Sequence, residues 1–360
     1  MSTTDILSGL RVVEFGAIGP APFCAMMLAD HGASITRIVQ PGHRDEIGDP
    51  SRDILNRGKT LVFLNLADES DQQLARSLCQ DADVVIEGFR PGVMERLGLG
   101  PDVLMADNPR LVFGRMTGWG QSGPYAQMAG HDINYIGLSG ALHACGRQDG
   151  APMPPLNLVG DFGGGGMLLA FGVLAACIAV QRTGQGRIVD CAMTDGSAIL
   201  MAMIYSFFGQ GLWRDQRETN LLDGGCPFYA TYETADRKYV ALGALEDRFF
   251  AIAVRTLGLE AHPAMADRWS PENWPRMKDV FAARFREKTR EDWSDVFAGT
   301  DACVTPVLSL AEAANHPQNA ARGTFLLRDG LLQPAAAPRF YSIPASSGGP
   351  SESRLKRVES

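Results

Sequence analysis

Two side chains that can move protons stand in unusual surroundings in this sequence. His131 lies between Gly130 and Asp132 in a long loop-rich stretch, and Asp161 follows an apolar segment and precedes a run of four glycines. Imidazole and carboxyl groups often serve as general acids and bases. Each residue also has a plainer explanation, because His131 can be a structural loop histidine and Asp161 a helix cap. The residue types alone leave both alternatives open.

Basic residues recur around the ends of the third and fourth predicted strands. They are Arg52, Arg57, Lys59, Arg90 and Arg96. Taken singly, each is typical of a solvated surface charge. Arginine offers a planar fork for phosphate oxygens and lysine a point charge, so their recurrence at one predicted edge of a sheet favours phosphate binding.

Other chemistries find little support among the reactive residues. Six histidines and seven cysteines are scattered, with no CxxC pair and no two histidines at metal-ligand spacing, so we expect no metal. The turn at 16–20 lacks the GxGxxG pattern, which argues against a nicotinamide dinucleotide. No GxSxG nucleophile elbow occurs. Cys24 and Cys226 have no evident basic partner in the nearby sequence that would activate them as nucleophiles.

The first 120 residues alternate between strand and helix signals. Helical stretches such as 22–30 and 69–80 lie between short segments rich in β-branched residues. Those segments are 10–15, 34–39, 60–66, 83–87 and 111–116. This alternation predicts βαβ units and an α/β fold with a doubly wound, mainly parallel sheet. Ligands of such folds bind outside the carboxyl ends of the strands.

The chain changes character after residue 118. The stretch 118–166 is loop-rich, and its apolar and aromatic content favours a functional loop. Segments 228–233 and 238–243 flank a short polar turn and predict a β-hairpin. An apolar segment at 167–180 predicts a buried helix, and a further apolar segment spans about 196–213. Charged helices are predicted at 247–257, 275–285 and 290–298, and a short return segment begins at 304–308.

Composition bounds the class of protein. The 41 acidic residues exceed the 33 basic ones, so no broad basic field exists to hold nucleic acid. The longest apolar run, 167–180, is shorter than the roughly 18 residues that suggest a membrane span. The amino terminus lacks signal-peptide features, and the unclustered cysteines suit a reducing compartment. We therefore expect a cytoplasmic protein with no membrane span.

Several stretches together resemble the class III CoA-transferase superfamily. NRGK at 56–59 and EGFRPGVMERLGLG at 87–100 point to the superfamily at large. GHDINY at 130–135 and LVGDFGGGG at 158–166 resemble more closely its α-methylacyl-CoA racemase branch. The similarity covers roughly residues 8–345. One departure is Gln40, which stands where close relatives can carry an arginine near the adenosine phosphate.

The resemblance implies an interlocked homodimer with the active site between the large domain of one subunit and the small domain of the other. The large domain would be Rossmann-like and the small domain α/β. The implied divisions are a large domain at 1–190 with a return segment at 325–345, a linker helix at 191–223, a small domain at 224–324 and a frayed tail at 346–360.

The resemblance also implies roles for individual residues. His131 and Asp161 correspond to the catalytic histidine and aspartate of the family. Glu246, which by itself looks like an ordinary first-turn helix glutamate, corresponds to a partner-subunit residue that orients the histidine. The implied lining of the CoA and acyl-thioester site is Arg57, Leu64, Asn65, Leu66, Ala67, Gly88, Phe89, Arg90, Arg96, Gly130, Asp132, Ile133, Asn134 and Tyr135.

Three functions follow as alternatives. The first is a cofactor-independent racemase that inverts the 2-carbon of 2-methylacyl-CoA thioesters through an enolate, with CoA as part of the substrate. The second is a CoA-transferase in which Asp161 is the nucleophile. The third is a non-catalytic acyl-CoA binding or scaffold protein. The presence of both His131 and Asp161 favours the racemase, because a transferase needs no base on the opposite face.

Overall fold

Six parallel strands form the main sheet of the structure, a computed structural model that describes residues 5–42 and 52–341. The strands are β1 (Arg11–Phe15), β2 (Ser34–Val39), β3 (Lys59–Phe63), β4 (Val84–Glu87), β5 (Val112–Thr117) and β6 (Arg187–Ala192). They lie in the order β3-β2-β1-β4-β5-β6. This is the doubly wound arrangement expected from the sequence, and its strand order reverses between β1 and β4.

Helices cover both faces of this sheet. Val12 and Val84 pack into one core with helices α1 (Pro20–Asp30) and α7 (Leu168–Thr183). Their neighbours Val13 and Val85 point the other way, into a core with α2 (Glu69–Gln80) and α4 (Pro101–Asp107). Burial on both faces explains why these strands are almost continuously apolar and could be predicted.

The strand β6 is a correction to the sequence analysis, which predicted no strand there. It lies at the edge of the sheet beside β5, and three of its first four residues are exposed. An exposed edge strand can carry charged residues such as Arg187 and Asp190, so it lacks the apolar run that marks the other five.

The long apolar helix begins earlier than predicted. Its first part, η3 (Leu158–Met167), has wide π-helical turns and continues directly into α7. The run Leu158–Thr183 is long and apolar enough to cross a membrane by length and composition, and 44% of its most apolar window is buried inside the protein. Its side chains Leu169 and Val173 belong to the core beneath the sheet. The glycine run expected to form a loop is therefore helical.

Short helices complete this part of the chain. They are η2 (Ile54–Asn56), α3 (Val93–Arg96), α5 (Asp132–Leu138), α6 (Ala141–Ala144), α8 (Met193–Leu200) and α9 (Ala202–Gly209). The last two account for the apolar segment predicted after residue 196, and α5 begins directly after His131.

A second unit is built on an antiparallel sheet. The predicted hairpin is confirmed as β7 (Tyr229–Glu233) and β8 (Tyr239–Gly243), and β9 (Val304–Val307) pairs with β8. The three predicted helices are confirmed as α10 (Asp247–Thr256), α11 (Trp274–Phe285) and α12 (Arg290–Phe297), with short turns η4 (Pro263–Met265) and η5 (Pro271–Asn273) between them. Large aromatic side chains from these elements form the core of this unit.

The chain then returns to the first unit. It passes through α13 (Leu310–Ala313), α14 (Pro317–Arg322) and the antiparallel pair β10 (Phe325–Arg328) and β11 (Leu331–Pro334). His31 at the end of α1 packs edge-on against Phe340, and its ring contacts the carbonyl of Ala337. The predicted tail 346–360 lies outside the described residues.

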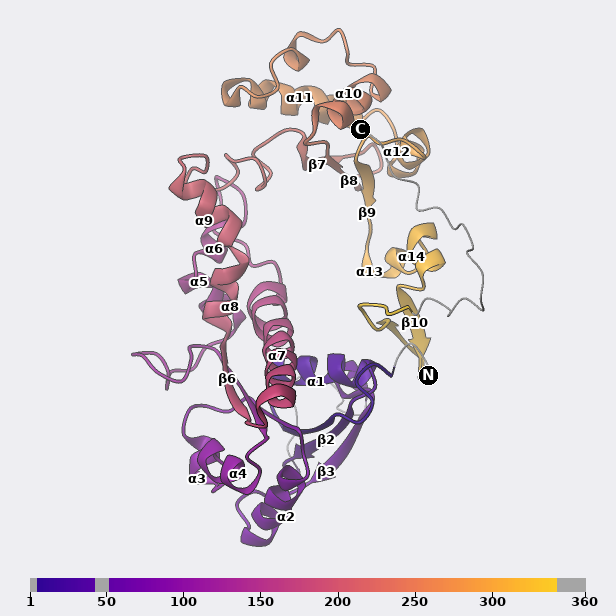
Figure 1. The fold of residues 1–360 in the computed structure, drawn as a ribbon. Coiled ribbons are helices and arrows are strands. Elements are labelled where there is room, and N and C mark those ends of the chain that lie inside the picture. Colours follow the sequence, from indigo (N-terminus) through magenta and orange to yellow (C-terminus); the bar gives the residue numbers. More distant parts are fainter. Residues whose placement is uncertain (1–4, 43–51, 342–360) are drawn as a thin grey trace, which may run out of the picture.

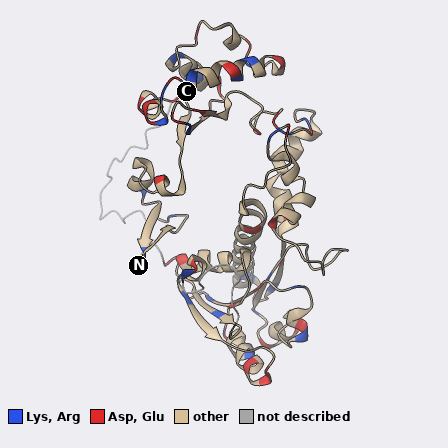
Figure 2. Cartoon of the chain, turned by 180° about the vertical axis from the view of Figure 1, so that it is seen from behind, with Lys and Arg blue, Asp and Glu red and all other residues tan. Residues whose placement is uncertain are grey.

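Figure 1 shows the two main sheets at opposite ends of the molecule. Helices α8 and α9 connect them on one side, and β9, α13 and α14 connect them on the other. Charged residues gather on the helices at the two ends, and the column of α7, α8 and α9 carries few of them (Figure 2).

Candidate active site

His131 is the capping residue of helix α5. Its backbone N–H donates to Asn134 Oδ1 at 3.0 Å, which fixes the first turn. Just before it, Gly130 packs so closely on two rings that a Cβ there would lie 2.8 Å from both Trp119 and Tyr135. The Tyr135 hydroxyl also donates to the Gly130 carbonyl. The backbone that leads into His131 is thus held by aromatic side chains, while the histidine itself is exposed.

Asp161 lies inside the first turn of η3, and the alternative that it caps a helix is wrong. The capping residue is Asn157, whose side-chain amide donates to Asp161 Oδ2 at 3.0 Å. The backbone N–H of Asp161 donates to Asp132 Oδ1 at 2.8 Å. Because Asp132 directly follows His131, this hydrogen bond joins two helix starts and brings His131 and Asp161 to one site.

Glycines let neighbouring segments approach η3 almost backbone to backbone. A Cβ at Gly164 would lie 2.6 Å from the backbone nitrogen of Ser197 in α8. A Cβ at Gly165 would lie 3.0 Å from the side chain of Pro20 in α1. The glycine run therefore packs η3 between α8 and α1. Wide π turns often occur at functional sites, and here they carry Asp161.

The Asp161 carboxyl group lies beside the turn that joins β1 to α1. Gly19, the capping residue of α1, has a φ of 70°, and a Cβ on it would stand 3.4 Å from Asp161 Oδ2. Helix α1 then begins with Pro20, Ala21 and Pro22. Since this turn follows the carboxyl end of β1, Asp161 lies at the sheet edge where doubly wound folds bind their ligands.

Burial raises the pKa of Asp161 above the usual range of a carboxyl group. The amide of Asn157 opposes this by donating to the charged form, and the negative charge of Asp132 adds to it. The charge of His131 acts on Asp161 in the lowering direction, so the two side chains lie within electrostatic reach. A carboxyl group with a raised pKa can hold a proton nearer neutral pH.

Tyr135 links Arg90 to the same group of residues. Burial raises the pKa of its phenol, the charge of Asp161 raises it further, and the charge of Arg90 lowers it. Asp132 also contributes a buried oxygen, Oδ2, that has no hydrogen-bond partner among the described residues. The site thus combines an exposed histidine, two carboxyl groups and an approaching arginine.

Two further loops lie at this edge of the sheet. Gly88, directly after β4, would place a Cβ 2.8 Å from the Cβ of Ala17, so only glycine fits this contact. In the turn after β3, Asn65 Oδ1 accepts from the amide of Gln40 at 2.9 Å and from the N–H of Ala67 at 3.2 Å. Gln40 therefore braces the 64–67 turn.

The remaining residues of these two predicted binding loops differ in exposure. Leu64 is buried, Leu66 and Phe89 are half-buried, and Arg90 and Arg96 are exposed. Ile133, in the first turn of α5, is also exposed. Exposed arginines remain available to an anionic ligand.

Arg57 makes contacts that the sequence analysis did not foresee. Its guanidinium pairs with the carboxylate of Asp30 through two nitrogens, at 2.8 and 2.5 Å. The third nitrogen donates to the carbonyl of Pro334 at 2.7 Å and to Gln333 Oε1 at 3.0 Å. Arg57 thus ties the carboxyl-terminal return to α1, and its predicted contact with CoA stays a prediction.

Glu246 lies in the other unit, where it caps α10 and is exposed. Its charge contributes to raising the pKa of Cys303, after burial as the first cause. In the described part of the chain no hydrogen bond joins its side chain to His131 or Asp161. A single chain therefore does not bring all three predicted catalytic residues together.

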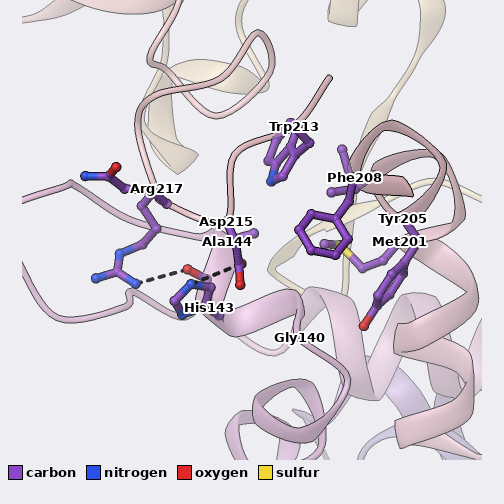
Figure 3. Close-up of a pocket in the computed structure, with 11 residues that line it drawn as sticks. Gly140, His143, Ala144, Met201, Tyr205, Phe208, Trp213, Asp215 and Arg217 are labelled. Atoms are coloured by element: carbon purple, nitrogen blue, oxygen red, sulfur yellow. Dashed lines mark hydrogen bonds and ion pairs between the residues drawn. The ribbon is translucent and has the colours of Figure 1, made fainter. Parts of the chain in front are cut away.

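Two cavities lie away from the His131–Asp161 site. One, of about 250 Å³, is lined by Tyr205 and Phe208 of α9, by Met201 directly before this helix, and by Trp213 and His143 (Figure 3). The other, of about 550 Å³, lies against the β7–β8–β9 sheet. Neither is lined by His131 or Asp161. Among the described residues, no group of three His, Cys, Asp or Glu side chains is arranged to hold a metal.

Sequence analysis missed one functional residue, Asn157. It stands four residues before Asp161, a spacing that places side chains together only on a helix. The four glycines that follow Phe162 disfavour a helix, so the sequence did not indicate one at 158–167. The spacing of Asn157 and Asp161 could therefore not be interpreted as a contact between their side chains.

Comparisons with known proteins identify the family of the chain. The sequence profile of CoA-transferase family III matches residues 7–354. The chain is 44% identical to the α-methylacyl-CoA racemases of mouse and human, over 94% of this chain and 88% and 87% of theirs. Its fold is similar to that of a CaiB/BaiF family protein from Brucella suis, with a TM-score of 0.79, 26% identity and coverage of 93% of this chain and 92% of that one.

Proposed function

The chain belongs to CoA-transferase family III, and from that premise we propose that it is an α-methylacyl-CoA racemase. It interconverts the 2R and 2S forms of 2-methylacyl-CoA thioesters. The observation that carries the proposal is the hydrogen bond from the Asp161 N–H to Asp132 Oδ1, because it joins the start of η3 to the residue after His131.

The proposed reaction moves one proton and needs no group beyond the enzyme and the acyl-CoA. The thioester carbonyl acidifies the hydrogen on the neighbouring carbon, since the carbanion delocalises onto the oxygen as an enolate. A base on one face breaks this C–H bond, and an acid on the other face forms a new one with inverted configuration. We assign these roles to His131 and Asp161, which exchange them in the reverse direction.

The electrostatics of Asp161 support this exchange. Two groups can trade a proton efficiently only when their pKa values are close, yet an ordinary carboxyl group titrates more than about two units below an imidazole. Burial raises the pKa of Asp161 and narrows that gap.

The enolate oxygen needs hydrogen-bond donors while it carries charge. The N–H groups of Asp132 and Ile133 are the first of helix α5, where an α-helix has no carbonyl of its own to receive them. We assign these two N–H groups to the enolate oxygen. They follow His131 directly, so one short segment supplies both a proton-transfer group and the charge stabilisation.

We assign the CoA moiety to the loops at the carboxyl ends of β3 and β4. These are Leu64, Asn65, Leu66 and Ala67, then Gly88, Phe89, Arg90 and Arg96, with the acyl thioester against Gly130, Asp132, Ile133, Asn134 and Tyr135. Arg90 and Arg96 are exposed and can pair with phosphate oxygens. Arg57 contributes through the return segment that it holds.

We further propose that the active enzyme is an interlocked homodimer in which a second copy supplies Glu246 to orient His131. Large apolar side chains are exposed along α7, α8 and α9, and exposed apolar patches of this kind mark protein interfaces. They include Phe171, Ile178, Ile199, Leu200, Met203 and Phe208. The separation of the two units within one chain supports the same arrangement (Figure 1).

We also propose a domain organisation for the chain and a cellular compartment for the protein. We divide the chain into a large domain at 1–190 with its return at 325–345, a linker at 191–223 and a small domain at 224–324. All seven cysteines are free, which suits a reducing cytoplasm.

A proton-exchange experiment tests the proposed function. The enzyme is incubated in D₂O with one enantiomer of a 2-methylacyl-CoA, and both deuterium at the 2-carbon and configuration are followed. We expect deuterium incorporation to accompany racemisation. Transfer of CoA from the thioester to a free acid, without loss of configuration, would replace the proposal by the transferase alternative, with Asp161 as the nucleophile.

Matched variants assign the residues. We expect His131→Ala and Asp161→Ala each to abolish racemisation, by roughly a thousandfold or more, because each removes one face of the proton transfer. His143→Ala is the control, since His143 is also exposed but lines the cavity beside α9. Full activity in either site variant would remove that residue from the mechanism.

A further inference from the structure

A buried ion-pair network lies at the base of the loop that carries Arg90 and Arg96. Glu87, the last residue of β4, is fully buried and stands opposite Arg115 in the parallel register with β5. Arg115 Nε donates to Glu87 Oε1 at 2.9 Å. The other carboxylate oxygen of Glu87 accepts the backbone N–H of Phe89 at 2.7 Å.

The far end of Arg115 holds the other end of the same loop. Its two terminal nitrogens donate to the carboxylate oxygens of Glu95 at 2.8 and 3.3 Å. Glu95 lies in α3, one residue before Arg96. One guanidinium fixed in the sheet therefore fastens both the start of the 88–96 loop, through Glu87, and its end, through Glu95.

Sheet stability alone does not explain these charges. Two positions earlier in the same register, the pair on this face of β4 and β5 is Val85 opposite Phe113, both fully buried. Removing ions from water is costly, and apolar pairs commonly stabilise a buried position equally well. The charged pair Glu87–Arg115 occupies the position where β4 ends and the 88–96 loop begins, whereas the apolar pair Val85–Phe113 lies inside the sheet.

We propose that Glu87, Arg115 and Glu95 are positioning residues that hold the 88–96 loop in the shape that binds the CoA moiety. The identity of that ligand rests on the proposed function. The network acts through Arg90 and Arg96, on affinity for the nucleotide end of the substrate, and leaves proton transfer unchanged.

The test uses Glu95→Gln, which breaks the ion pair at its exposed end and leaves the buried Glu87–Arg115 pair in place. Two substrates carry the same 2-methylacyl group, one on CoA and one on N-acetylcysteamine, which lacks the nucleotide. For the CoA thioester we expect KM to rise about five- to tenfold with kcat within about twofold of wild type. For the truncated thioester we expect kcat/KM to stay within about twofold of wild type.

A matched control is Asp107→Asn. It breaks the ion pair of Asp107 with Arg76, another fork-to-carboxylate contact, between α4 and α2. We expect it to change neither KM nor kcat for either substrate. Arg115→Lys, which keeps the charge but loses the fork, should raise KM for the CoA thioester as Glu95→Gln does.

Two results would overturn the network's role: an unchanged KM for the CoA thioester in Glu95→Gln, or an equal loss of kcat/KM with both substrates. A wild-type protein that racemises neither substrate would instead contradict the proposed function. In that case calorimetric titration with free CoA still tests the network, because an unchanged Kd in Glu95→Gln would overturn it.

Discussion

The two units of this protein are packed in opposite ways. Around Asp161, glycines bring η3, α1 and α8 together nearly backbone to backbone. The three-stranded unit instead fills its centre with large rings, which contact one another edge-on or stacked. They are Phe228, Tyr232, Phe250, Phe281, Phe285, Trp293 and Phe297.

This difference indicates what each unit is sensitive to. A backbone contact has no side chain that can move aside, so added atoms should be costly around Asp161. A core of rings should tolerate some repacking but lose much stability when a ring is removed. The candidate chemistry lies in the first kind of packing, where the positions of hydrogen-bonding groups are set by the backbone itself.

The largest effect is expected for Gly196→Ala. A Cβ at Gly196 would overlap the carbonyl of Gly164, so α8 and η3 must separate. We expect a loss of about 4 kcal/mol or more in the free energy of unfolding, measured by denaturant titration. The control is Gly209→Ala in α9, which meets no neighbouring atom and should change stability by about 1 kcal/mol at most, in the stabilising direction. Equal stability of both variants would contradict the backbone-contact explanation.

Removal of a ring from the other unit should cost nearly as much. Phe281 is fully buried and contacts Tyr232 and Phe250, so Phe281→Ala should lower the free energy of unfolding by about 3–5 kcal/mol. Tyr239→Ala, at a half-exposed strand position in the same unit, should cost about 1 kcal/mol or less. A similar loss in both variants would mean that ring burial does not govern this core.

A smaller, pH-dependent effect is expected at Glu87. Burial raises its pKa to about 7, against the opposing effects of the Phe89 N–H and Arg115. The folded state therefore binds this proton more tightly than the unfolded state, and stability falls as pH rises from about 4.5 to 7. Glu87→Gln removes this titration, so from pH 5 to 8 its unfolding free energy should improve relative to wild type by about 1–3 kcal/mol. If the unfolding free energies of the two proteins changed with pH in parallel, the raised pKa of Glu87 would be refuted.

The smallest effect is expected at Asn157. Its amide donates to the charged form of Asp161, so Asn157→Ala should raise the pKa of that carboxyl group further. Where Asp161 acts as the base, the acidic limb of kcat/KM should move to higher pH by up to about one unit. Asn108→Ala, which removes a side-chain contact at the far end of the sheet, should leave the profile unchanged.

The inner strands of the sheet could be predicted because they are buried on both faces. Val12 and Val13 enter different cores, and that double burial leaves a readable apolar run in the sequence. The edge strand β6 was missed because its exposed positions include the charged residues Arg187 and Asp190, whereas β3, the other edge strand, keeps an apolar run in its sequence. The aromatic unit was also predictable, because its hairpin turn and amphipathic helices are local signals.

The site was only partly predictable. Glycine disfavours helix, so nothing local marks 158–166 as helical; the contacts of η3 with α1 and α8 decide it. The partners of Arg57 are equally hidden, because Asp30 and Pro334 lie far from it in the sequence. Sequence motifs identified His131 and Asp161, but the hydrogen bond through Asp132 that joins them depends on tertiary structure.

The two prolines that open helix α1 affect which ligands its first turn can bind. Pro20 and Pro22 carry no backbone N–H, so the first turn lacks two of the donors with which such helices usually grip a pyrophosphate. The carboxyl group of Asp161 lies beside this turn instead, and its pKa is raised by burial. This turn therefore offers a carboxyl group that can give or take a proton, where two of the backbone donors for an anion are missing.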